Sequence, residues 1–102
     1  MATLRIEGEI ETDVAAIFAE QLAQMTKDDA PLTLDLSEAE VEDARTCATL
    51  IDAIRDAAKR LGGLQILEPP QVIAHILYRI GALEAGGVIH VVAPREEIGT
   101  SS

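Results

Sequence analysis

Three acidic side chains stand around the junction between a predicted strand and the helix that follows it. Asp35 lies within the apolar strand pattern of residues 32–36, and Glu42 and Asp43 come just before a helical pattern begins. If Asp35 lies close to Asp43, the two carboxylates could bind a cation, or their repulsion could raise the pKa of one. The alternative is structural, because acids before a helix cap its free N–H groups and interact favourably with its dipole. We favour hydrogen bonds that fix the loop.

The other chemistry-bearing side chains do not form a recognisable catalytic or metal site. His75 and His90 are the only histidines, and no Cys or carboxylate stands at metal-ligand spacing from them. Zinc needs three or four convergent ligands, so we predict no metal and no cofactor. Cys47 could be a low-pKa thiol near a helix N-terminus, but a small buried apolar side chain is the favoured interpretation. The glycine pairs at 62–63 and 86–87 are typical of turns rather than of a phosphate-binding loop.

The charge of the chain is unevenly distributed. Residues 1–43 hold twelve acidic and two basic side chains, whereas residues 44–102 hold six of each, for a formal net charge of −10. We expect no nucleic-acid partner, because such binding needs a basic face and aromatic stacking platforms, and only Phe18 and Tyr78 are aromatic. No apolar stretch approaches the roughly 20 residues of a membrane span, and nothing resembles a signal peptide. We expect a soluble cytoplasmic protein without membrane insertion.

Strand and helix patterns alternate along the chain. The strand patterns cover residues 3–10, 32–36, 64–67 and 88–92. Apolar stripes at helical spacing lie between them, at Val14, Ile17, Phe18, Leu22 and Met25, at Cys47, Leu50, Ile51, Ile54, Ala58 and Leu61, and at Val72, Ile73, Ile76, Leu77 and Ile80. This alternation predicts a single α/β domain over residues 1–94, with a mostly parallel or mixed sheet of about four strands. Residues 95–102 are expected to form a flexible tail.

The stretch from residue 32 to residue 62 is the centre of this organisation. Its strand pattern leads into an acidic turn at 37–43, and Asp43 and Gly62 stand where the N-cap and C-cap of the next helix belong. In such strand–helix units a ligand or partner usually meets the carboxyl end of the strand and the start of the helix. The last strand pattern, at 88–92, is a nearly continuous apolar run, which predicts a strand covered on both faces.

The order and spacing of these motifs resemble those of STAS domains, the anti-sigma-factor antagonist family. The resemblance covers nearly the whole chain, through LRIEGEIE near the start, LTLDLS in the middle, LGGLQIL and the final VIHVV. The family's phosphorylation loop reads roughly Asp-Ser-Ser/Thr-Gly-Leu, and the matching run here begins at Asp43. Ala44 then stands in place of the phosphorylatable serine, Arg45 in place of the second hydroxyl residue, and Thr46 in place of the glycine.

The resemblance implies a bacterial regulatory module that acts in transcription regulation by partner switching, without catalysis. In that family a cognate anti-sigma-type kinase phosphorylates the loop serine, and the added charge controls binding. Ala44 cannot receive a phosphate, so three alternatives stay open. The loop could dock constitutively, Thr46 or Ser37 could be the acceptor, or the chain could resemble the small STAS subunits of bacterial lipid-transport complexes, which bind an ATPase.

The predicted docking surface is the 37–49 region with neighbouring residues of the first helix. Its candidate partner-binding residues are Glu40, Glu42, Asp43, Arg45, Thr46 and Thr49. The partner implied by the resemblance is an anti-sigma-factor-type kinase or another ATPase-fold protein, and the chain could also form a homodimer. A cation at a helix N-terminus opposes the dipole by about 0.3–1 kcal/mol, so Arg45 should pair with Glu42, Asp43 or a partner's carboxylate. The competing class is an enzyme or small-ligand binder that uses the Asp35/Asp43 corner.

Overall fold

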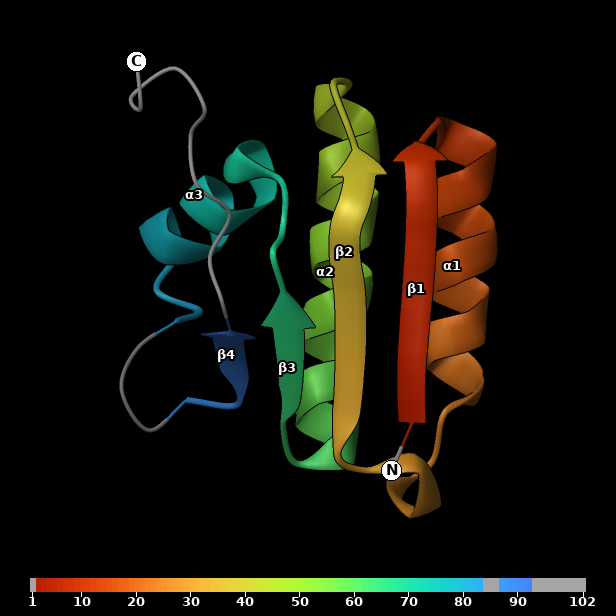
Figure 1. The fold of residues 1–102 in the computed structure, drawn as a ribbon. Helices are drawn as coiled ribbons and strands as arrows, with labels where there is room; N and C mark the ends of the chain where they lie inside the picture. The colour runs from red at the N-terminus through yellow and green to blue at the C-terminus, as the bar shows by residue number, and fades with distance from the viewer. Residues whose placement is uncertain (1, 84–86, 93–102) are drawn as a thin grey trace.

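The computed structural model describes residues 2–83 and 87–92 of the chain. Across these residues strands and helices alternate, and the four described strands are parallel in one sheet (Figure 1). The strands are β1 (Ala2–Glu9), β2 (Leu32–Glu40), β3 (Leu64–Leu67) and β4 (Ile89–Val92). The helices are α1 (Thr12–Gln24), α2 (Ala44–Leu61) and α3 (Gln71–Arg79), with a short 3-10 helix, η1 (Lys27–Asp29), before β2. The predicted α/β class is confirmed. The predicted tail at 95–102 lies outside the described residues.

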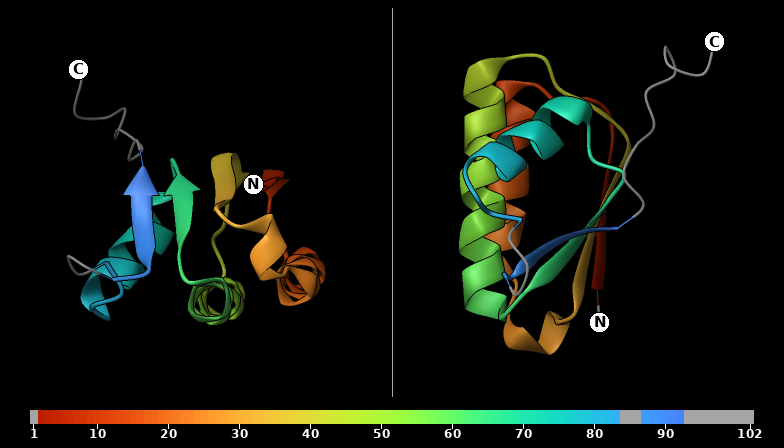
Figure 2. Two further views of the ribbon diagram at one scale, coloured as in Figure 1. Left: turned by 90° about the horizontal axis from the view of Figure 1, so that it is seen from below. Right: turned by 90° about the vertical axis from the view of Figure 1, so that its left-hand side faces the viewer.

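The strands lie side by side in chain order, β1-β2-β3-β4. Right-handed crossovers that always advance in the same direction place every connecting helix on the same face of a sheet. Figure 2 shows this layer of helices, with α2 between α1 and α3. The opposite face of the sheet is open, and its side chains are polar in the middle strands, such as Thr33 and Asp35 on β2 and Gln65 on β3.

Helices cover only one face of the sheet, and this changes the burial expected for the last strand. The prediction that residues 88–92 form a strand covered on both faces is wrong. β4 begins at Ile89, which is buried, whereas His90 and Val92 are exposed. Since successive side chains of a strand point to opposite faces, a sheet with helices on one face buries only every second residue.

β2 is longer than its sequence pattern predicts. The strand continues through most of the predicted acidic turn at 37–43, so that part of the prediction is wrong. Its register with β1 pairs Arg5 with Asp35, but two residues further along β1 it pairs Glu7 with Glu38. β2 therefore contains one extra residue between these pairs, which is a β-bulge.

The Asp35 side chain supports this bulge. Its Oδ1 accepts hydrogen bonds from the backbone N–H of Ser37 at 3.0 Å and from the Ser37 hydroxyl at 2.6 Å. The extra residue also reverses the alternation of the strand, so that Ala39 and Val41 are buried after Leu36. The acidic residues between and beyond them can then stay in solvent while the strand keeps its apolar side on the core.

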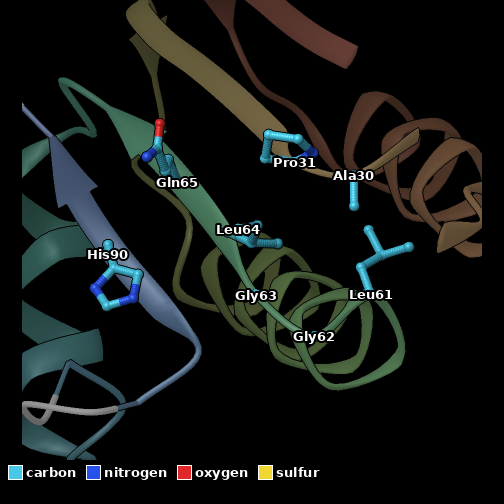
Figure 3. Close-up of a pocket in the computed structure, with 8 residues that line it drawn as sticks. All are labelled: Ala30, Pro31, Leu61, Gly62, Gly63, Leu64, Gln65 and His90. Atoms are coloured by element: carbon cyan, nitrogen blue, oxygen red, sulfur yellow. The ribbon is translucent and has the colours of Figure 1, made fainter. Parts of the chain in front are cut away.

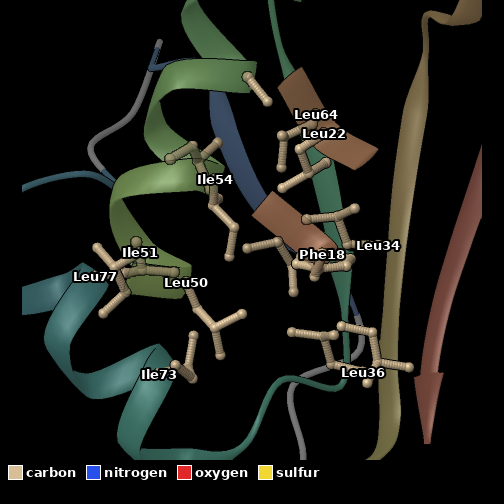
Figure 4. Close-up of a cluster of buried hydrophobic side chains, with 14 of the residues drawn as sticks. Phe18, Leu22, Leu34, Leu36, Leu50, Ile51, Ile54, Leu64, Ile73 and Leu77 are labelled. Carbon is tan, nitrogen blue, oxygen red and sulfur yellow. The ribbon is translucent and has the colours of Figure 1, made fainter. Parts of the chain in front are cut away.

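The central helix α2 follows its sequence signals closely. Asp43 is its N-cap, and Gly62 ends it in the left-handed conformation at φ 80°, as predicted. Leu50, Ile51 and Ile54 are buried, also as predicted. Figure 4 shows these side chains meeting residues of α1, α3 and the sheet in one core.

The outer helices bury less than their apolar stripes predict. Ile17 on α1 is 58 % exposed and Val14 is 37 % exposed, whereas Phe18 is buried. Val72, near the start of α3, and Ile80, just after its end, are exposed as well. Within residues 2–83 and 87–92, α1 and α3 each have a helix neighbour on one side only, which leaves part of their apolar stripes exposed (Figure 2).

Candidate functional site

The carboxyl ends of β1 and β2 and the first turns of α1 and α2 lie together at one end of the molecule (Figure 1). Parallel strands followed by returning helices produce this arrangement in any sheet of this kind. The predicted docking residues Glu40, Glu42, Asp43, Arg45 and Thr49 all belong to the β2–α2 junction at this end. Glu40, Glu42, Asp43 and Arg45 are exposed, and Thr49 is half-buried.

A chain of three hydrogen-bonding side chains fixes the start of α2. Asp43 Oδ2 accepts from the backbone N–H of Thr46 at 2.9 Å and from its hydroxyl at 3.0 Å. The Thr46 hydroxyl lies 3.3 Å from the hydroxyl of Thr12, the first residue of α1. Because Thr46 donates its single hydroxyl proton to Asp43, Thr12 is the donor to Thr46. This Thr12–Thr46–Asp43 network joins the first turns of α1 and α2.

The network decides the properties of Asp43 and Thr46. The backbone N–H of Thr46, and then its hydroxyl, lower the pKa of the Asp43 carboxyl, so it is ionised at neutral pH. Thr46 is fully buried. In this conformation it offers no surface to a partner and no accessible hydroxyl to a kinase, although the sequence analysis predicts both roles for it.

Ala44 and Arg45 form the exposed beginning of α2. Ala44 is the first residue of the helix and carries no polar atom on its side chain. The Arg45 side chain makes no ion pair or hydrogen bond with any residue in the described part of the chain. Its backbone carbonyl accepts a hydrogen bond from the Thr49 hydroxyl at 3.2 Å.

Asp35 and Asp43 each have a partner of their own. Asp35 pairs in register with Arg5 inside the sheet, and the Ser37 hydroxyl and N–H lower the pKa of its carboxyl. A carboxylate pair that shared one site would instead have one raised pKa. Within residues 2–83 and 87–92, no three His, Cys, Asp or Glu side chains come together as a metal site would require. The geometry therefore favours structural roles for Asp35 and Asp43 over a ligand-binding corner.

Cys47 is buried on the core side of α2. Burial raises the pKa of its thiol, and the negative charge of Asp43 raises it further. The helix N-terminus therefore does not produce a reactive thiolate here, and Cys47 acts as a small apolar side chain in the core.

A ladder of acidic side chains extends from the same end onto the open face of the sheet. Glu7 lies opposite Glu38, and Glu9 lies opposite Glu40, in neighbouring strands. The four side chains are exposed. Sequence reasoning finds the acidic excess of residues 1–43 but misses this pairing, because it depends on the register that the bulge sets.

A hollow lies where β2 and β3 begin, at the end of the sheet opposite the predicted docking residues, and Figure 3 shows the residues that line it. It has a volume of about 420 Å³ and is lined by Ala30, Pro31, Leu61, Gly62, Gly63, Leu64, Gln65 and His90. Its polar side chains, Gln65 and His90, are neighbours across β3 and β4. No motif in the sequence predicts a site at this position.

No helix in the described part of the chain is long and apolar enough to cross a membrane.

Comparison with known proteins gives one match that covers most of the chain. A protein-family model described as "Mlab, STAS domain" matches residues 1–89. No curated protein matches the sequence. The matched range begins with β1 and ends at the first residue of β4, so it includes the bulge, the start of α2 and the network of Asp43.

Proposed function

Because the chain belongs to the STAS domain family, we propose that it is a protein-binding module that holds its partner without a phosphorylation switch. Membership of the family supports a regulatory or protein-interaction role in general, and STAS domains are generally binding modules rather than enzymes. The observation that carries the finer proposal is Ala44. It occupies the exposed first position of α2, where the resemblance places the phosphorylatable serine, and it has no oxygen to accept a phosphate.

The two alternative phosphate acceptors, Thr46 and Ser37, support the absence of a switch. Thr46 is fully buried, and its hydroxyl is bound between Asp43 and Thr12. Ser37 is half-buried and donates to Asp35 at 2.6 Å within the bulge. Transfer of a phosphate to either oxygen would break these bonds and add about −1.5 to −2 charge beside carboxylates. Constitutive docking requires no such change.

The docking surface is the exposed β2–α2 junction, with Glu40, Glu42, Asp43, Arg45 and Thr49. The Thr12–Thr46–Asp43 network fixes the backbone of this junction before any partner arrives, which lowers the ordering cost of binding. The neighbouring acidic ladder favours a partner with a basic face, because complementary charge speeds association and fixes orientation. We therefore propose that Thr46 supports the surface from inside rather than forming part of it.

Two kinds of ATPase-fold partner fit this proposal. One is an anti-sigma-factor-type kinase, which would make the chain an antagonist that cannot be switched off at the loop and a regulator of transcription. The other is the ATPase of a lipid-transport complex, with the chain as a small accessory subunit. The missing acceptor at Ala44 favours the second, since a subunit of a permanent complex needs no switch. In both cases the partner uses ATP, so we propose that the chain acts in the cytoplasm.

Intact-mass spectrometry tests the absence of a switch. Wild type and Ala44→Ser are incubated separately with anti-sigma-type kinases and ATP. We expect no added phosphate on the wild type and one on Ala44→Ser, because the serine would stand exposed at the first position of α2. A stoichiometric phosphate on the wild type, mapped to Ser37 or Thr46, would replace constitutive docking with a relocated switch.

Affinity purification from the native cell tests the docking surface. The bait is the wild-type domain, and Glu42→Arg and Val72→Asp serve as the surface variant and the distant control. We expect an ATPase-fold protein that the wild type and Val72→Asp both retain and Glu42→Arg loses. Equal recovery by all three baits would show that this junction is not the docking surface.

A further inference from the structure

The hollow where β2 and β3 begin has the size and lining of a site for a small molecule. Its volume of about 420 Å³ falls within the roughly 300–1,000 Å³ that ligand pockets occupy. Pro31, Leu61 and Leu64 form its apolar wall. Gln65 and His90 are its hydrogen-bonding side chains (Figure 3). Apolar walls with a few polar groups that fix the orientation of the ligand are typical of such sites.

Gln65 and His90 are placed so that one small molecule can contact both. They are register partners on β3 and β4, so their side chains lie on the same face of the sheet, on strands about 4.8 Å apart. Both side chains are exposed, and neither makes a hydrogen bond or an ion pair with another residue in the ranges 2–83 and 87–92. Their donors and acceptors are therefore available to a ligand.

The lining of the hollow favours an uncharged ligand. The described residues that line it include no Asp, Glu, Lys or Arg. An anion would find no cation there, on a chain whose formal net charge is −10, and a cation would find no carboxylate. The Gln65 amide has both a donor and an acceptor. A ligand with an N–H and a C=O side by side can therefore form two hydrogen bonds with it, in the way that glutamine binds the edge of adenine.

We propose that this hollow binds a small uncharged molecule that carries a carboxamide or cyclic amide on a ring, through the side chains of Gln65 and His90. The amide bonds to these two side chains, and the ring packs against the apolar wall. The hollow lies at the end of the sheet opposite the β2–α2 junction. The site is therefore separate from the proposed docking surface, and the proposal does not depend on docking.

NMR titration of the full chain with matched probes tests the chemistry of the site. Nicotinamide carries an uncharged carboxamide on a ring, nicotinate has a carboxylate in its place, and 3-acetylpyridine keeps the C=O without the N–H. We expect nicotinamide to shift the backbone amide signals of Gly63, Gln65 and His90 until they saturate. Nicotinate and 3-acetylpyridine should have a Kd at least about fivefold higher, because each lacks the N–H that donates to Gln65.

Substitutions at the two polar side chains test the residues. Gln65→Leu and His90→Leu should each raise the Kd of nicotinamide at least about fivefold, because each removes a hydrogen bond to the ligand. Both residues are exposed, so neither substitution should unfold the protein. Thr33→Val is the matched control, since Thr33 is the register partner of Gln65 on β2 but does not line the hollow. It should bind nicotinamide as the wild type does.

Several outcomes would overturn the proposal. Shifts that do not saturate, or that lie mainly outside the hollow, would show that nicotinamide does not bind there. Equal affinity for nicotinamide and nicotinate would show that the site does not select an uncharged amide, and unchanged affinity in Gln65→Leu would remove the role of Gln65. Glu42→Arg, which tests the docking surface, should bind nicotinamide as the wild type does, so the two proposals can fail separately.

Discussion

α1 and α3 flank the central helix on opposite sides, and both pack apolar side chains into the core that α2 shares with the sheet. α1 is joined to α2 by polar bridges at both ends. Thr12 bonds to Thr46 where the two helices begin, and Arg60 donates to the carbonyl oxygens of Leu22 and Met25, at 2.7 and 3.0 Å, where they end. On the other side, Ile73 and Leu77 of α3 pack against the α2 core through apolar contact.

The difference shows how the fold divides its tasks. Apolar packing is tolerant of small shifts, because it has no preferred direction. Hydrogen bonds require particular atoms at particular positions, so these bridges fix the two helices relative to each other. The fixed pair, α1 and α2, holds the β2–α2 junction that forms the proposed docking surface. α3 completes the core without contributing predicted docking residues.

Removal of a core side chain of α2, the helix on which both α1 and α3 pack, should have the largest effect on stability. Ile54 is fully buried at the middle of α2. Ile54→Ala should lower the free energy of unfolding by about 2–5 kcal/mol, combining lost transfer energy with a cavity. Urea titration measures this loss, and Ile17→Ala on the exposed flank of α1 should change stability by less than about 0.5 kcal/mol. A comparable loss in both variants would mean that this flank of α1 is covered in solution.

A substitution at Thr46 should remove one of the two polar bridges between α1 and α2. Thr46→Val keeps the volume but removes the hydroxyl that links Thr12 to Asp43, so the charged Asp43 carboxylate and the Thr12 hydroxyl each lose one hydrogen bond. We expect a loss of about 1–3 kcal/mol in urea titration and weaker binding of the partner, because the docking surface loses its internal support. Thr49→Val is the matched control on the same helix, and it should cost less than about 0.5 kcal/mol. Equal losses at both positions would show that the network does not fix the first turns.

The smallest expected effect concerns the acidic ladder on β1 and β2. Glu9 lies opposite Glu40, and like charges in directly opposed positions destabilise a sheet. Glu9→Gln should therefore raise the free energy of unfolding by about 0.2–1 kcal/mol at low salt. The gain should shrink as salt screens charges over about 10 Å at 0.1 M. Glu20→Gln, on the exposed side of α1, changes the net charge equally and is the control. If Glu20→Gln raised the free energy of unfolding as much as Glu9→Gln does, the gain would not come from the ladder.

The parts of the fold that sequence reasoning predicts correctly have local signals. α2 has an aspartate before its first turn, a glycine after its last, and an apolar residue at every third or fourth position between them. The predictions are wrong where the environment of a residue depends on elements that are distant in the sequence. Ile17 has the spacing of a core residue, but no local pattern shows that α1 is the last helix of the layer. The bulge in β2 also lacks a local signal, since acidic residues such as Glu38 and Glu40 are typical of a turn.

The candidate site likewise has one feature with a local sequence signal and one without. The capping role of Asp43 follows from its place in the sequence. The bond between Thr12 and Thr46 joins residues 34 positions apart and becomes visible only once both helices are placed. For the same reason, sequence reasoning treats Thr46 as an exposed first-turn residue, whereas α1 covers it.

The order of strands in the sheet has a consequence for synthesis on the ribosome. Each described strand pairs with the strand that precedes it in the chain, so no strand has to wait for a distant partner. Once β2 and α2 have emerged, β1, α1 and both polar bridges can form before β3 leaves the ribosome. Contacts between elements close in sequence also favour fast folding. The proposed docking surface is therefore expected to assemble early, before the C-terminal third of the chain has left the ribosome.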